Sequence, residues 1–183
     1  MIIAVCKDDP TDVEIAKAAS KKYQATFGNW YKIYDKKIPN LGATENLFII
    51  AHGASYTDEG QPVIGNMADA FYLTARNLNA NMHLFPSGYS GGVYIYACES
   101  ADHGAAEVSF VLAYLKCVKP SYPNIKVFGQ TGKIHGPLPV PSDPSWKSAT
   151  GPCLYQAIRH GSQQRPKFLL GGRLSSVPKW NYR

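Results

Sequence analysis

The sequence predicts an α/β fold with a mostly parallel central sheet and helices on both faces of that sheet. Short apolar runs at 47–51, 92–96 and 124–128 are rich in β-branched and aromatic residues, which is typical of buried parallel strands. Helical patterns lie between these runs, and crossovers of this length join parallel neighbours. Because the chain has 183 residues and is 45% hydrophobic, we expect one domain over 1–183. Its core is expected at about 1–132, followed by an irregular basic segment at 133–183.

The first elements follow from apolar runs and capping signals near the N-terminus. Met1 to Val5 is apolar and predicts the first strand. Thr11, with Glu14 three residues later, forms a capping box and predicts a helix from Asp12 to about Tyr23. The aromatic stretch 28–34 is β-prone and is followed by lysines, which favours a strand at the edge of the sheet.

The segment after the strand 47–51 is predicted to cross to the strand 92–96. Glycine and proline interrupt residues 54–66, which indicates a loop or a small hairpin. Asn66, with Asp69 three residues later, is typical of a helix start and predicts a crossover helix to about Leu78.

The second half of the chain repeats the alternation of strand and helix. A helix is expected from Ala105 to about Cys117, and its apolar stripe comprises Val108, Val111, Leu112 and Leu115. The strand at 124–128 follows, closed by Gly129. Residues 132–151 are rich in proline and glycine and predict a long irregular segment. Two further short elements are expected at 153–160 and 167–172.

The charge of the chain is uneven. The formal net charge is +6, and all seven charged side chains after Asp143 are Lys or Arg. These charges are spread singly, which favours a solvated basic surface over an anion site, and nucleic acid is not an expected partner. The four cysteines are widely spaced without a C-x-x-C motif, so neither a zinc site nor a disulfide framework is predicted. We expect reduced thiols, as in a cytosolic protein.

The apolar runs are far shorter than the roughly 18 residues that a membrane span needs. The N-terminus does not resemble a signal peptide. The sequence therefore predicts a soluble protein.

Two polar residues with catalytic potential come directly after the predicted buried strands. His52 follows the strand 47–51, and Cys98 follows the strand 92–96 after one alanine. Because the carboxyl ends of parallel strands meet at one sheet edge, a thiol nucleophile and an imidazole base are expected there together. Gly53 permits close backbone approach, and its N–H together with that of Cys98 is a candidate oxyanion hole.

Two other interpretations remain open. Gly88 to Gly92 matches the G-x-S-x-G motif, which would make Ser90 the nucleophile of a serine esterase. The motif precedes a strand instead of following one, so its context is reversed. In the second alternative, His52 and Cys98 are structural and the chain is a non-catalytic anion-binding module. The other histidines lack the spacing of metal ligands, so no metal or cofactor is expected.

The arrangement of His52-Gly53 and Ala97-Cys98 at two strand ends resembles the caspase and haemoglobinase superfamily (clan CD) of cysteine peptidases. The stretch Ala97 to Ser100 is similar to the corresponding stretch of legumain. Phe128 to Gly132, with the proline-rich loop after it, resembles bacterial toxin-associated members. The likeness covers about 47–132.

The resemblance implies a three-layer sandwich with peptidase activity on protein substrates. Cys98 would attack the scissile carbonyl, His52 would protonate the leaving amine, and the Gly53 and Cys98 amides would hold the oxyanion. The pocket for the side chain before the cut would comprise Glu99, Ser100, Gly129, Gln130 and Thr131. Cys6-Lys7-Asp8 replaces the basic pocket residues of legumain, so specificity for asparagine is not implied.

The toxin-associated members also suggest a setting for the activity. The resemblance implies a processing enzyme or an effector delivered into the cytosol of a target cell. Some of these members are switched on by a highly phosphorylated inositol. An anionic activator of that kind would bind the basic C-terminal segment, at Arg159, Arg165, Lys167 and Arg173.

Overall fold

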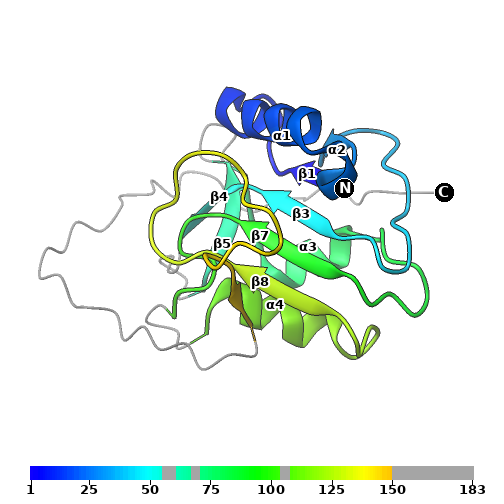
Figure 1. Cartoon of the computed structure of the whole chain (residues 1–183). Helices are drawn as coiled ribbons and strands as arrows, with labels where there is room; N and C mark the ends of the chain where they lie inside the picture. The colour runs from blue at the N-terminus through cyan, green and yellow to red at the C-terminus, as the bar shows by residue number, and fades with distance from the viewer. Residues whose placement is uncertain (55–60, 67–70, 104–107, 150–183) are drawn as a thin grey trace, which may run out of the picture.

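Six strands form the central sheet of the computed structural model, which describes residues 1–54, 61–66, 71–103 and 108–149 (Figure 1). The strand order is β2-β1-β3-β7-β8-β9, and every pair is parallel except β8 with β9. The strands are β1 Ile2–Ala4, β2 Trp30–Lys32, β3 Leu47–Ile50, β7 Gly92–Tyr96, β8 Lys126–Gly129 and β9 Lys147–Ser148. The predicted α/β class and its mostly parallel sheet are confirmed.

Helices cover both faces of this sheet because alternate residues of each strand point to opposite sides. The helices are α1 Pro10–Lys22, α2 Gln24–Phe27, α3 Ala75–Asn81 and α4 Phe110–Val118. Leu47, Ile49, Val93 and Ile95 pack with α3 and α4, in one apolar cluster. Phe48, Ile50, Tyr94 and Tyr96 pack with α1 and α2, in the other. We call the second side of the sheet the α1 face (Figure 1).

The α1 face is built largely from aromatic rings. Phe27 of α2 meets Phe48 edge-on at 4.8 Å between ring centroids, Phe48 stacks on Tyr94 at 5.0 Å, and Tyr94 stacks on Phe128 at 4.7 Å. This row crosses three neighbouring strands, β3, β7 and β8, and contributes both apolar burial and favourable ring geometry. It fixes the relative positions of the strands that lead to the candidate site.

The start of α1 differs from the prediction. The helix begins at Pro10, and Asp9 is its N-cap, with Oδ1 accepting the backbone N–H groups of Thr11 and Asp12 at 2.9 and 3.2 Å. The predicted cap at Thr11 was wrong because proline fits the first helical position, where no N–H is needed. The residue before the proline then becomes the cap. Tyr23, near which the helix was predicted to end, is the C-cap and is 44% exposed.

The predicted crossover helix from Asn66 was also wrong. Residues after β3 form a three-stranded antiparallel sheet of β4 His52–Ala54, β5 Val63–Asn66 and β6 Phe71–Thr74. Helix α3 begins only at Ala75, where the Thr74 hydroxyl accepts the N–H of Asn77. The run Phe71-Tyr72-Leu73-Thr74 has strong β-propensity, and pairing with β5 decides its structure. The expected hairpin at 54–66 is present in β4 and β5.

The C-terminal half of the described chain follows the prediction more closely. Helix α4 begins at Phe110, later than the predicted Ala105, so Val108 precedes the helix. Val111 and Leu115 are buried as expected, Leu112 is half-buried, and Phe110, Tyr114 and Val118 complete the buried side. Beyond β8 the chain is irregular up to β9, and three of its residues, Leu138, Trp146 and Ala149, are buried in the two clusters. Packing against the sheet therefore continues past residue 132.

Some predicted features lie outside the described residues. These are the elements at 153–160 and 167–172 and the basic positions Arg159, Arg165, Lys167 and Arg173. Within the ranges that the structure describes, every helix is too short or too polar to cross a bilayer.

Candidate functional site

His52 and Cys98 lie at the same level, each two residues past the end of one of the neighbouring strands β3 and β7. In the parallel pair β3 and β7, Ile50 is opposite Tyr96, and each candidate side chain comes two residues later. The pairing continues one step past β3, since the N–H of Ala51 donates to the Tyr96 carbonyl at 3.1 Å. Neighbouring strands are about 4.8 Å apart, so the two chain segments emerge side by side at the carboxyl edge of the sheet.

Both side chains also belong to the α1 face. Ile50 and Tyr96, the last residues of β3 and β7, point to that face. The contacts of each side chain agree with this. His52 meets Asp9 at the start of α1, and the Cys98 sulfur meets Ile134, which packs on the α1-face cluster.

Gly53 brings the backbone after the histidine against the backbone of the cysteine. A Cβ at this position would collide with the Cys98 carbonyl oxygen and would lie 3.1 Å from the Ala97 Cβ and 3.2 Å from the Cys98 nitrogen. Only glycine fits so close an approach between two chain segments. The chain segments that carry His52 and Cys98 are therefore in direct contact.

Asp9 holds the imidazole of His52. The Asp9 Oδ2 atom lies 3.1 Å from His52 Nε2, and the side chains are 12% and 52% exposed, respectively. Burial acts to raise the pKa of Asp9, but hydrogen bonds from the Asp12 N–H and from His52 bring the pKa below its ordinary value. Asp9 is therefore a carboxylate, and it favours the imidazole form that carries a proton on Nε2. In neutral His52, Nδ1 is then the basic nitrogen.

Asp12 is a second acid beside His52. It is 4% exposed, and its Oδ2 atom has no hydrogen-bond partner. Burial raises the pKa of Asp12 to about 6, while nearby His52 acts to lower the pKa and Asp9 to raise it. One donor atom from each of Asp9, Asp12 and His52 lies within 4.8 Å of the others. The site thus contains an acidic pair beside an exposed imidazole.

The Cys98 thiol is half-buried under the loop that follows β8, drawn in yellow at the carboxyl edge of the sheet (Figure 1). The Ile134 N–H donates to the sulfur at 3.4 Å, and the nearby Tyr96 hydroxyl donates to the Gly136 carbonyl at 2.9 Å. The thiol in turn donates toward the Ile134 carbonyl oxygen at 4.0 Å. The Cys6 thiol is buried, and burial raises its pKa to about 11.

The residue after the thiol has an unusual backbone. Glu99 adopts a φ of +56°, a left-handed conformation that side chains other than glycine rarely take. Its N–H donates to the Gly132 carbonyl at 2.8 Å, which joins the Cys98 turn to the loop after β8. Left-handed residues of this kind store strain and are often found at functional sites.

The other predicted pocket residues fall into two groups. The Ser100 hydroxyl is buried and bridges β7 and β8, donating to the Ile95 carbonyl at 3.1 Å and accepting the Gln130 N–H at 2.9 Å. Gly129 is packed against Ser100, and the buried Gln130 amide donates to Ser145 at 3.3 Å. Ser100, Gly129 and Gln130 thus support the turn after β7 by packing and hydrogen bonds. Glu99 and Thr131 are half-buried, and their role as pocket walls stays a prediction.

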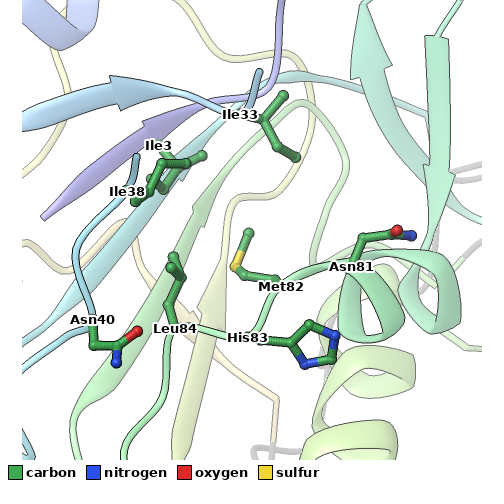
Figure 2. A pocket seen from close by; sticks show the side chains of 8 residues that line it. All are labelled: Ile3, Ile33, Ile38, Asn40, Asn81, Met82, His83 and Leu84. Carbon is green, nitrogen blue, oxygen red and sulfur yellow. The ribbon is translucent and has the colours of Figure 1, made fainter. Parts of the chain in front are cut away.

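Ser90 lies elsewhere. It precedes β7, so it is at the amino edge of the sheet, where its N–H donates to the Ala43 carbonyl at 2.8 Å. The strand that a nucleophile elbow requires before its serine is absent from residues 82–89. A mostly apolar pocket that includes His83 and Met82 is on the other face of the sheet, opposite the α1 face (Figure 2). It is not connected with His52 or Cys98.

Sequence reasoning missed Asp9 and Asp12. A signal was present, because both residues follow the first parallel strand at the same edge as His52 and Cys98. From the sequence, Asp12 is only the predicted first residue of a helix, and Asp9 has no predicted role. Comparison of the chain with known protein families, curated proteins and solved structures finds no match.

Proposed function

We propose that this protein is a cysteine endopeptidase with a caspase-like three-layer sandwich, in which Cys98 is the nucleophile and His52 the acid and base. The observation that supports it best is that the two residues lie at the same level, two residues past the ends of β3 and β7, with Gly53 packed against the Cys98 backbone. In α/β folds, ligands bind and reactions take place at the carboxyl edge of the parallel sheet.

In the first step, the Cys98 thiolate attacks the carbonyl carbon of the scissile peptide bond. A carbon–sulfur bond forms, and the carbonyl π electrons move to the oxygen. The N–H groups of Gly53 and Cys98 are the proposed donors to this oxyanion. The Ile134 N–H, which donates to the sulfur at 3.4 Å, holds the Cys98 side chain in place before the attack.

In the second step, protonated His52 gives a proton to the leaving nitrogen, the carbon–nitrogen bond breaks, and a thioester remains on Cys98. Water then attacks the thioester while His52 accepts its proton, and the acid product leaves with the thiolate restored. Asp9 orients the ring through Nε2 and stabilises the imidazolium, so it is a positioning residue.

The pocket before the cut is proposed to include Glu99 and Thr131, at the start of the loops after β7 and β8. The substrates are proposed to be proteins in a cytosol, either that of the producing cell or that of a cell into which the protein is delivered. The basic segment after residue 149 is the proposed place for an anionic activator. The esterase alternative is weaker, because Ser90 is at the amino edge of the sheet.

A peptide library with every residue type before the scissile bond tests the proposal. We expect cleavage by the wild-type chain, with and without inositol hexakisphosphate as the probe activator, and loss of at least 100-fold in Cys98→Ala and His52→Ala. The matched controls Cys117→Ala and Ser90→Ala should keep the wild-type rate. Cleavage that survives Cys98→Ala, or no cleavage of any peptide, would contradict the proposal.

Alkylation gives a second readout that needs no substrate. Iodoacetamide, followed by mass spectrometry of peptides, should modify Cys98 faster than Cys117, whereas the buried Cys6 should be modified only after unfolding. The Cys98 rate should fall in Asp9→Asn if the carboxylate supports the imidazolium–thiolate pair. Equal rates at Cys98 and Cys117 would argue against an activated thiol.

A further inference from the structure

Three side chains at the carboxyl edge present metal-binding atoms toward a common centre. They come from two separate parts of the chain: Asp9 and Asp12 from the start of α1, and His52 from β4. One donor atom of each lies within 4.8 Å of the other two, and His52 Nε2 is 3.1 Å from Asp9 Oδ2. Two carboxylates and an imidazole are common ligands of divalent transition metals.

An independent feature of Asp12 points to a ligand at this centre. Its side chain is 4% exposed, and Oδ2 is a buried acceptor without a hydrogen-bond partner. Native proteins rarely leave a buried carboxylate oxygen unpaired, because the oxygen loses its water without gaining a donor. A cation between Asp12 and its neighbours Asp9 and His52 would supply the missing partner.

The geometry favours a small ion with a low coordination number. Zinc binds imidazole nitrogen and carboxylate oxygen at about 2.0–2.2 Å, so tetrahedral donors are about 3.3–3.6 Å apart. The Asp9 and His52 atoms are already near that separation, and the Asp12 donor, which is within 4.8 Å of both, needs to move by at most about 1.5 Å. Because His52 is about half exposed, its ring has room to adjust. Calcium and magnesium require six or more ligands, mostly oxygen and water, which suits this trio less.

The N-terminus of α1 works against a cation, since its dipole is positive there. Binding at this place therefore requires the negative charge of both carboxylates. It follows that neutralising either acid should weaken binding strongly, although the side chain would still offer an oxygen atom.

We propose that Asp9, Asp12 and His52 form a binding site for a Zn²⁺-type divalent ion, with water completing the tetrahedron. The metal and the peptidase mechanism would use the same imidazole, so the zinc-bound form is inactive in peptide cleavage. This last consequence rests on the proposed function, whereas the metal site itself does not.

Calorimetric titration of the chelator-treated full chain with ZnCl2 tests the site. We expect a binding event that weakens at least tenfold in Asp12→Asn and in His52→Ala. The matched control is Asp8→Asn, because Asp8 is a neighbouring acid that pairs with Lys32 at 2.9 Å and is outside the trio. Cys98→Ala should also bind as the wild type does. MgCl2 and CaCl2 should bind at least tenfold more weakly than ZnCl2.

Cobalt(II) substitution distinguishes this site from a thiolate site. The expected complex shows no thiolate-to-cobalt charge-transfer band, and its d–d spectrum is lost in His52→Ala, a half-exposed position whose change leaves the core intact. The proposal is overturned if zinc affinity is unchanged in both variants, or if binding is lost in Cys98→Ala but kept in Asp12→Asn. A chain that binds zinc in this pattern but cleaves no peptide keeps the metal site and removes only the peptidase.

Discussion

Replacing Gly53 by alanine tests the contact on which the candidate site depends. The added methyl group would collide with the Cys98 carbonyl oxygen and would be 3.1 Å from the Ala97 Cβ and 3.2 Å from the Cys98 nitrogen. The obstacles are mainly backbone atoms of Cys98 in the turn after β7, which cannot rotate away as a side-chain end could. The segments that carry His52 and Cys98 must therefore separate.

The expected cost follows from this geometry. Forcing an extra methyl into a packed site typically destabilises a protein by about 1–3 kcal/mol. For a chain of this size, each kcal/mol lowers the melting temperature by roughly 2–4 °C, so we expect a decrease of about 2–12 °C in Gly53→Ala. If the thiol and the imidazole move apart by about 1 Å, the rate of cleavage should fall by about 100-fold.

Gly42→Ala is the matched control. A Cβ there would meet its nearest neighbour, the Glu45 Cβ, at an ordinary 3.6 Å, and Gly42 is not among the glycines with positive φ. Its melting temperature should equal that of the wild type or exceed it slightly. Thermal denaturation and peptide cleavage, measured on both variants, test whether the segments at Gly53 and Cys98 are in contact. If Gly53→Ala melts and cleaves like Gly42→Ala, the two segments are not in contact and the proposed site is wrong.

Three further predictions concern the acids of the site. Asp9→Asn should keep the helix cap, since an amide oxygen accepts the same N–H groups, but should lower the rate of cleavage at least tenfold. Asp9→Ala should also destabilise the protein by about 1 kcal/mol, which denaturant titration measures. The pKa of Asp12 is raised from 3.8 to about 6 in the fold, so with chelator present its titration should lower the free energy of unfolding by up to about 3 kcal/mol as pH rises from 4 to above 6. Relative to Asp12→Asn, the wild type should therefore lose this stability over that range, and equal pH dependence of the two would refute the raised pKa. Glu99→Gly should relieve about 1 kcal/mol of left-handed backbone strain and raise the melting temperature, whereas Glu99→Ala should not. Equal melting temperatures of the two variants would refute the backbone strain.

Sequence reasoning succeeded where one local signal dominated. The runs that became β3 and β7 are apolar at every position, and such runs have few alternatives to a buried strand. It failed at 71–74, where tertiary pairing with β5 decided between helix and strand. Short segments of mixed pattern give no local basis for that decision.

The residues of the candidate site were likewise predictable only where one local signal in the sequence dominated. His52, Gly53 and Cys98 could be nominated because each follows an apolar strand directly. The contribution of Asp9 could not be seen in the same way, since 43 residues separate it from His52 and the cap of α1 is set by Pro10. Partners brought together by neighbouring strand ends are found only when the strand order is known.

The hydrogen bond from Ile134 to the Cys98 sulfur has a consequence for how reagents reach the thiol. Main chain already occupies one side of the sulfur atom, so approach is open only from the remaining directions. Compact electrophiles should then react much faster than bulky ones of equal intrinsic reactivity. An extended polypeptide that reaches the sulfur must either fit beside residues 132–136 or displace them, and in the second case turnover would begin after a lag.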